Sequence, residues 1–296
     1  MSNRPAVARY VGKVFLKSIL VIAPTVVAYG GGVTGVRVVA TDLDGTLLRS
    51  DGTVSDRTRT ALEGAWAAGI STVFVTARPP RWLDDLVDHV GDHGIAICGN
   101  GAFVYDVAEQ QVIESRGFST ADLLTLAGDL RQEIPGIRFA VERADGMGSE
   151  DDYVYREETA GTTRGPLEEL AATTVGKLLA RSDEMSSEDF LRAVAGVVGD
   201  RANLGFSGAI GLAELTAPGV TKAAGLSIWC SEQGIGPDQV VACGDMPNDL
   251  PMLEWAGHAV AVANAHPDVL AVAHEVVASN DDDGVADVLE HLSKVR

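Results

Sequence analysis

Two carboxylates stand one residue apart in Asp42-Leu43-Asp44-Gly45-Thr46, at the point where an apolar run ends. In a strand the side chains of positions i and i+2 share a face, so Asp42 and Asp44 can address one reacting centre. Gly45 permits a sharp turn after them, and Thr46 can hydrogen-bond locally and begin the next segment. The pair suits a nucleophile that works beside a proton donor.

Three further segments carry polar side chains at the end of an apolar run or at the start of a helix. Thr76-Ala77-Arg78 follows a second apolar run, and Lys222 opens a helix of small residues. A third run leads into an acidic cluster made of Gly244, Asp245, Met246, Pro247, Asn248 and Asp249. Because ligands of an open parallel sheet lie beyond the carboxyl ends of its strands, we expect all four segments to meet at one edge.

The first chemical role predicted for these residues is nucleophilic attack on phosphorus. Asp42 supplies a carboxylate, but a carboxylate approaches a phosphate dianion only if charge is neutralised. Mg²⁺ held by oxygen atoms of Asp42, Asp44 and Asp245 would provide that neutralisation. Crowding by the other carboxylates is expected to raise the proton affinity of Asp44, which suits it to protonate a leaving alcohol and later to activate water.

Phosphate binding is the second predicted role. Lys222 and the Thr76 hydroxyl can bind phosphate oxygens as charge redistributes in the transition state. The backbone N–H groups of Leu43 and Ala77 can add further donors. For Arg78 two interpretations stay open, a substrate contact and a structural ion pair. Each segment taken alone also fits an ordinary turn or a solvated helix end, so the prediction depends on all of them together.

The elements that must position these residues are strands alternating with helices. Apolar β-branched runs predict strands at residues 36–41, 71–76, 95–98, 239–244 and 258–263. Helical periodicity predicts a helix from an N-cap at Ser55 to Gly69, another at residues 81–90, and one between the last two strands. This alternation is typical of a parallel sheet with helices on both faces, so the predicted fold class is α/β with a doubly wound, Rossmann-like core.

An α+β insertion interrupts this pattern. It is predicted to occupy residues 117–212, between core segments at 34–116 and 213–296. It follows a hairpin at 103–114, and its helices and strands are expected at residues 122–133, 137–142, 175–180, 187–198 and 211–216. A segment of this size can form a domain of its own. For Glu142 the preferred interpretation is an exposed strand charge, and the alternative is a substrate contact.

The charge balance and the cysteines limit the classes of partner and compartment. With 42 acidic and 23 basic residues the formal net charge is −19, whereas nucleic-acid binding needs clustered cations. We therefore expect a small-molecule substrate that is held by a few placed cations and a metal. Three cysteines without a metal-ligand spacing to histidine favour reduced, buried thiols in a cytoplasmic protein over a disulfide framework or a zinc site. The oligomeric state has no signature in the sequence.

Residues 1–33 form a basic and partly apolar extension. The first forty residues hold five basic and no acidic side chains, and the apolar run at 18–28 is shorter than the roughly 20 residues that span a bilayer. We prefer a dispensable extension ahead of a start near Val33. The alternatives are a targeting signal cleaved after Ala28, which implies export, and an arm on a membrane surface. No stable membrane span is expected.

In their order the four segments resemble the motifs of the haloacid dehalogenase superfamily. The insertion between the second and third motifs resembles the Cof-type sugar phosphatases with an α+β cap, subclass IIB, and the resemblance covers residues 34–296. It implies Asp42 as nucleophile and Asp44 as general acid/base. Mg²⁺ would be bound by Asp42, the Asp44 backbone carbonyl and Asp245, with support from Asp249. The implied phosphate contacts come from Leu43, Thr76, Ala77, Lys222 and Asn248.

Other positions fit the same resemblance to different degrees. Ala77 stands where the family more commonly has glycine, although its backbone contact should survive. Accessory signatures of the family resemble three further segments, namely Asn100-Gly101, Asn264-Ala265 and Ser279-Asn280 to Gly284-Val285-Ala286.

The reaction predicted is Mg²⁺-dependent hydrolysis of a small phosphorylated metabolite, a sugar phosphate by resemblance, through an aspartyl phosphate. A phosphohexomutase is the nearest alternative, because related capped enzymes use the same intermediate and return the phosphoryl group. A non-catalytic phospho-acceptor is the alternative from another class, since signalling receivers also combine aspartate, threonine, lysine and Mg²⁺. Receivers, however, have the size of a single domain and carry no cap.

Overall fold

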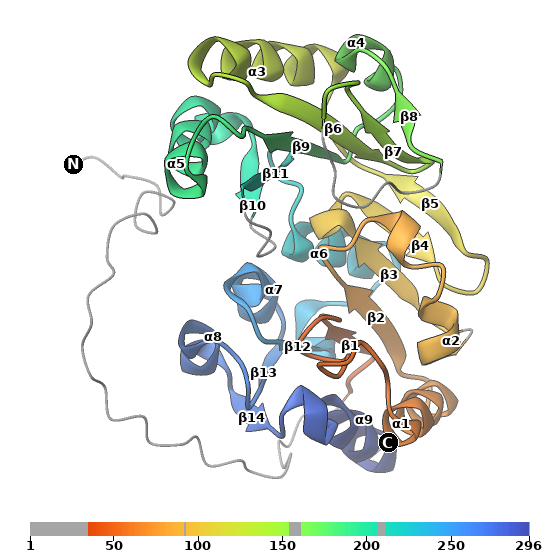
Figure 1. The fold of residues 1–296 in the computed structure, drawn as a ribbon. Helices are drawn as coiled ribbons and strands as arrows, with labels where there is room; N and C mark the ends of the chain where they lie inside the picture. Colours follow the sequence, from red (N-terminus) through yellow and green to blue (C-terminus); the bar gives the residue numbers. More distant parts are fainter. Residues whose placement is uncertain (1–34, 92, 154–160, 206–210, 296) are drawn as a thin grey trace, which may run out of the picture.

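The computed structural model describes residues 35–91, 93–153, 161–205 and 211–295. These residues form an eight-stranded sheet and a separate six-stranded sheet (Figure 1). The predictions for the extension, residues 1–33, lie outside the described residues. Within the described ranges, no helix combines the length and the apolar character that crossing a bilayer requires.

The eight-stranded sheet has the order β14-β13-β12-β1-β2-β3-β4-β5. Its strands run parallel from β14 to β3, and β4 and β5 add an antiparallel hairpin at one edge. All four residues of β1 are buried because it lies between β12 and β2 with both faces covered. The bounds are β1 (Val38–Thr41), β2 (Ser71–Val75), β3 (Ile95–Cys98), β4 (Phe103–Asp106), β5 (Gln111–Ser115), β12 (Val240–Gly244), β13 (His258–Val262) and β14 (Glu275–Val277).

Helices cover both faces of this sheet. The chain crosses from β1 through α1 to β2 in one direction and from β12 through α7 to β13 in the other, so right-handed crossovers place the two helices on opposite faces. Helix α9 packs on α1, while α6, α7 and α8 follow one another on the other side (Figure 1). The predicted doubly wound α/β core is thus confirmed. The bounds are α1 (Asp56–Ala67), α2 (Leu86–Val90), α6 (Lys222–Glu232), α7 (Leu250–Trp255), α8 (Pro267–Val272) and α9 (Gly284–Val295).

The second sheet has the order β10-β11-β9-β6-β7-β8, and all of its pairs are antiparallel except β7 with β8. Helices α3, α4 and α5 cover its outer face (Figure 1). We call these strands and helices the six-stranded unit. The bounds are α3 (Thr120–Glu133), β6 (Arg138–Arg143), β7 (Gly146–Ser149), β8 (Thr163–Arg164), α4 (Leu167–Leu170), β9 (Lys177–Arg181), α5 (Ser187–Val198), β10 (Asn203–Gly205) and β11 (Leu212–Thr216). Because β11 pairs with β9, the unit continues to Thr216, past the boundary expected at residue 212.

The helix expected at residues 81–90 is confirmed only in its second half, and one short strand lacks a sequence signal. A short 3₁₀ turn, η2 (Pro80–Trp82), comes first, and α2 begins at Leu86 after an irregular stretch. Within the irregular stretch the Gln110 side chain donates to the Asp84 carbonyl, and the Leu86 N–H donates to the Leu83 carbonyl. Strand β7 reads Gly-Met-Gly-Ser and carries little periodicity. The three cysteines, Cys98, Cys230 and Cys243, are free and buried, as predicted.

Candidate active site

Asp42 occupies the carboxyl end of the central strand. Its N–H donates to the Cys243 carbonyl at 3.0 Å, so pairing with β12 continues one residue past β1. The chain then turns sharply, and the Leu43 carbonyl accepts bonds from the N–H groups of Thr46 and Leu48. This turn leaves the Asp42 side chain inside the protein, with 5% of the residue exposed.

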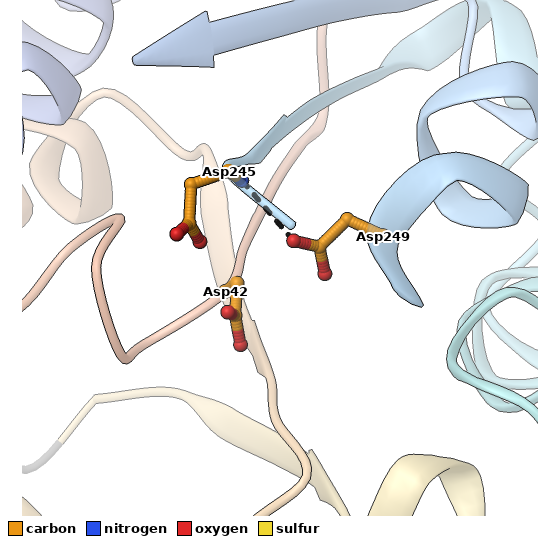
Figure 2. A group of neighbouring side chains, drawn as sticks. All are labelled: Asp42, Asp245 and Asp249. Carbon is orange, nitrogen blue, oxygen red and sulfur yellow. Dashed lines mark hydrogen bonds between the residues drawn. The ribbon is translucent and has the colours of Figure 1, made fainter. Parts of the chain in front are cut away.

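Three carboxylates converge at this strand end. Oxygens of Asp42, Asp245 and Asp249 lie within 4.8 Å of one another, and all three residues are buried (Figure 2). Asp249 is held by the start of its own loop, because its Oδ2 accepts from the N–H groups of Asp245 (3.1 Å) and Met246 (3.0 Å). The short η6 turn (Pro247–Asp249) brings its carboxylate back to the end of β12.

Lys222 provides the cation inside this cluster. It is the first residue of α6, whose N-cap residue Thr221 accepts a bond from the Ala224 N–H. The ammonium of Lys222 donates to Oδ1 of Asp42 and to Oδ1 of Asp249, both at 2.8 Å. One ammonium faces three carboxylates, so the cluster keeps an excess of negative charge.

Burial and charge change the proton affinity of this cluster. Burial raises the pKa of Asp42 to about 7, Lys222 opposes this, and Asp249 and Asp245 add to it. Burial likewise raises the pKa of Asp245 to about 6, against the Thr46 hydrogen bond. For Lys222 burial acts to lower the pKa, but the charges of Asp249 and Asp42 outweigh it and the net direction is upward. The site therefore favours any cation that relieves the carboxylates.

The residues present fit a hard divalent cation. Carboxylate oxygens are the ligands that Mg²⁺ and Ca²⁺ take in proteins. Gly45 has a φ of +81°, and a Cβ built on it would lie 2.5 Å from Oδ2 of Asp245. A residue larger than glycine at position 45 would therefore displace the Asp245 carboxylate from the cluster. Both oxygens of Asp249 already accept hydrogen bonds, from Lys222 and from the N–H groups of Asp245 and Met246, so this residue orients its neighbours.

The loop after β2 brings the second segment to the same edge. Thr76 is almost fully buried, its N–H donates to the Ile97 carbonyl, and its own carbonyl accepts from the Asn100 N–H. Its hydroxyl oxygen accepts from the Arg78 N–H at 3.1 Å. The loop is thus held through both its backbone and this hydroxyl, which faces the peptide between Ala77 and Arg78.

Asp44 differs from its predicted surroundings. Its side chain is 58% exposed and forms a two-point ion pair with Arg78, with Nη2 to Oδ1 at 2.6 Å and Nε to Oδ2 at 2.9 Å. The expected crowding of Asp44 by carboxylates is therefore wrong, because the guanidinium is its nearest charged partner. Arg78 forms the structural ion pair that the sequence left as one of two interpretations.

Two other sequence-based interpretations change in the structure. Glu142 is buried, with 3% of the residue exposed, and its carboxylate pairs with Arg81 at 2.7 Å and 3.0 Å. The prediction that Glu142 is an exposed strand charge is therefore wrong. Thr46 does not bond locally through its side chain, since its hydroxyl donates to Asp245 Oδ1 at 2.7 Å. Asn248 is exposed beside Asp249 on η6, at the same sheet edge. Spacing along the chain could not indicate the contacts of Glu142 and Thr46, because their partners lie far away in the sequence.

Two asparagines support the turn that carries Asp42 and Asp44. Asn264 donates to the Gly45 carbonyl at 2.8 Å, and its Oδ1 accepts from the Asn280 N–H. The buried Asn280 side chain in turn donates to the Leu48 carbonyl. Both positions occur in the accessory signatures of the sequence, but the structure alone assigns them this role.

Comparison with known proteins identifies the family. Residues 39–289 match the family described as haloacid dehalogenase-like hydrolase. The chain is 28% identical over 272 residues to the pyridoxal phosphate phosphatase YbhA of Escherichia coli, covering 86% of this chain and 98% of that protein. It is 26% identical over 260 residues to the 5-amino-6-(5-phospho-D-ribitylamino)uracil phosphatase YitU of Bacillus subtilis, covering 85% and 96%.

Another relative is a longer protein. The chain is 29% identical over 269 residues, 84% of its length, to the chloroplastic endoribonuclease YBEY of Arabidopsis thaliana, but it spans only 45% of that protein. Among solved structures, a haloacid dehalogenase-like hydrolase from B. subtilis has a TM-score of 0.72 at 24% identity, covering 86% of this chain and 99% of the other. One from Bacteroides thetaiotaomicron has a TM-score of 0.69 at 22% identity, covering 87% and 99%. These structural likenesses support the fold.

The chain therefore belongs to the haloacid dehalogenase-like hydrolases, because the family match spans most of its length. Homologues that it covers almost from end to end are named phosphatases. The predicted family and the predicted enzyme class, a phosphatase, are both confirmed.

The protein without metal should lose thermal stability as the pH rises from about 5 to 8. Asp42 and Asp245 bind protons more tightly in the folded than in the unfolded chain, so their contribution is fully present below the unfolded pKa of 3.8 and is lost as the pH passes 6 and 7. A cation binds the deprotonated carboxylates, so Mg²⁺ should raise the Tm more at pH 8 than at pH 5. Thermal melts with EDTA or Mg²⁺ test this.

Asp42→Asn is the control for that pH dependence. It removes the group with the larger upward shift in pKa, so the fall in Tm between pH 5 and 8 should become smaller. An unchanged fall in the variant would show that other groups cause it.

Gly45→Ala should weaken divalent-cation binding as well as folding. The positive φ alone should lower the free energy of unfolding by about 1–3 kcal/mol, and the new Cβ would displace Asp245. Gly52→Ala is the matched control, because Gly52 has a φ of +82° but nothing within 4 Å of the added Cβ. Both variants should melt earlier, but only Gly45→Ala should lose the Mg²⁺-induced rise in Tm. An equal response of the two variants to Mg²⁺ would contradict the role assigned to Gly45, which is to leave room for the Asp245 carboxylate.

Proposed function

We propose that this hydrolase is a Mg²⁺-dependent phosphomonoesterase that transfers the phosphoryl group of a small metabolite to Asp42 and then to water. The observation that supports it most directly is the buried Asp42 carboxylate, bonded to Lys222 at the end of the central strand, within a cluster of acids. A buried carboxylate without competing water is a better nucleophile than a solvated one. Its position beyond β1 is where open parallel sheets bind ligands.

In this proposal the metal site involves three residues of two segments. The side chains of Asp42 and Asp245 and the backbone carbonyl of Asp44 would hold Mg²⁺, while Asp249 orients the loop at Asp245 and the Lys222 ammonium. When bound, Mg²⁺ offsets the repulsion between the nucleophile and the phosphate dianion. Lys222 keeps Asp42 oriented through Oδ1 and adds a positive charge near the transferred group.

The remaining side chains bind the phosphate or move protons. The Thr76 hydroxyl and the backbone N–H groups of Leu43 and Ala77 donate to phosphate oxygens, and Asn248 approaches from the exposed side of the same edge. Asp44 gives a proton to the leaving alcohol and then takes one from the attacking water. Asp44 lies at the rim of the same edge, where Arg78 Nη2 is 2.6 Å from its Oδ1.

We propose that the six-stranded unit, residues 117–216, caps the site. Residues 34–116 and 217–296 then form the core. The unit is bonded to the loop after β2, where Lys177 donates to the Ala77 carbonyl and Glu142 accepts from Arg81. Such a cap excludes bulk water and limits the leaving group to a small metabolite. We propose a sugar phosphate in a cytoplasmic setting, and the reduced, buried cysteines agree with that compartment. The relatives are named for other small phosphomonoesters, so the cap's side chains would select among them.

A panel of phosphorylated sugars, nucleotides and cofactor precursors should identify a substrate that releases orthophosphate only with Mg²⁺. Release without a bisphosphate activator, measured by a phosphate assay, distinguishes hydrolysis from a phosphohexomutase. Incorporation of ¹⁸O from labelled water into the released orthophosphate supports hydrolysis. Isomerised sugar phosphate with no free phosphate would instead make the protein a mutase.

Asp42→Asn should reduce phosphatase turnover by at least about 10³-fold, because the amide cannot form the aspartyl phosphate. Steady-state rates on the best substrate of the panel measure the loss. Glu63→Gln removes one acidic charge from the exposed side of α1 and should keep the wild-type rate. Retained Mg²⁺-dependent turnover in Asp42→Asn would show that another residue is the nucleophile.

A further inference from the structure

A buried ion pair of the six-stranded unit contacts the loop after β2. Lys177, at the start of β9, is 3% exposed, and its ammonium donates to Glu214 Oε2 of β11 at 2.6 Å. The same ammonium donates to the backbone carbonyl of Ala77 at 2.9 Å. A cation of the insertion is therefore bonded directly to the segment that carries Thr76.

The peptide between Ala77 and Arg78 is held on both of its sides. Its carbonyl oxygen accepts from Lys177, and its N–H donates to the Thr76 hydroxyl oxygen at 3.1 Å. A hydroxyl that accepts this bond still has its own hydrogen to donate. The orientation of one peptide thus links the Lys177 ammonium to the direction in which the Thr76 hydroxyl donates.

A contribution to folding stability does not by itself explain the buried ion pair between Lys177 and Glu214. Removing two charges from water costs free energy, and replacing a buried ion pair with apolar side chains is often neutral or stabilising. Lys177 lies opposite Glu142 in the register of β9 with β6, and Glu142 pairs with Arg81 farther along the loop. Two charges of this sheet thus contact a short stretch of core, and of the two it is Lys177 that bonds the Ala77–Arg78 peptide.

We propose that Lys177 is a positioning residue for phosphate binding, which acts through the Ala77–Arg78 peptide on the Thr76 hydroxyl. When the six-stranded unit is seated, Lys177 fixes the peptide and the hydroxyl donates toward the phosphate position. Without that bond the peptide can rotate, and the hydroxyl loses its fixed direction. The inference deepens the proposed function and rests on it for the identity of the bound group.

The test is a double-mutant cycle between the ion pair and the hydroxyl. Lys177→Met is combined with Glu214→Met, so that no unpaired charge stays buried, and Thr76→Val removes the hydroxyl at similar volume. The Met pair should lower kcat/KM by about 10- to 100-fold in the wild-type background. In the Thr76→Val background the same change should cost less than about 3-fold, because the hydroxyl through which it acts is absent.

The second ion pair of this interface supplies the matched control. Arg81→Met with Glu142→Met removes another buried contact between unit and core but none of the bonds to the Ala77–Arg78 peptide. Its effect should multiply with that of Thr76→Val, since the two act independently. Equal coupling of both ion pairs to Thr76 would indicate a general effect of seating the unit and would overturn the specific role of Lys177.

Binding of orthophosphate separates this inference from the proposed function. It is measured calorimetrically in the presence of Mg²⁺, and the Met pair should weaken it in the wild type but hardly in Thr76→Val. If that pattern appears and no phosphomonoester is hydrolysed, the proposed function falls and the role of Lys177 stands. If hydrolysis is found and the losses from the two changes simply multiply, the role of Lys177 is overturned and the function stands. Absence of both hydrolysis and orthophosphate binding in the wild type would overturn both.

Discussion

The ammonium of Lys222 between the carboxylates of Asp42 and Asp249 is the interaction on which the site depends. All three groups are removed from water, so each would be unfavourable without the others. The lysine does not balance the cluster, because Asp245 adds a third carboxylate nearby. The folded chain thus keeps a buried excess of negative charge. Burial, together with the neighbouring carboxylates, raises the pKa of Asp42 and Asp245, so a cation is the natural complement of the site.

Contacts within the core hold these charged groups in place. Gly45 allows Asp245 to approach the turn, and Asn264 and Asn280 hold the same turn from β13 and beyond β14. Asp249 accepts bonds from two N–H groups of its own loop, which orders the chain directly after β12. A parallel sheet makes such convergence simple, because all of its strand ends meet at one edge.

The six-stranded unit adds a different kind of control. Its buried charges, Lys177 and Glu142, contact the loop after β2 instead of the acidic cluster. Among the described residues, the Asp42 carboxylate is bonded within the core, whereas the loop that carries Thr76 is bonded by both the core and the six-stranded unit.

The sequence by itself determined the α/β core and the order of the four polar segments that meet at its edge. Apolar runs that end in carboxylates, hydroxyls or glycine are local patterns, and strand ends in a parallel sheet share one edge. Only the tertiary structure decided the partner of each charge. Asp44 faces Arg78 instead of other acids, Glu142 is buried against Arg81, and Lys177 reaches Ala77 across 100 residues of chain. Spacing along a chain cannot indicate these contacts, because packing between two separate sheets brings their atoms together.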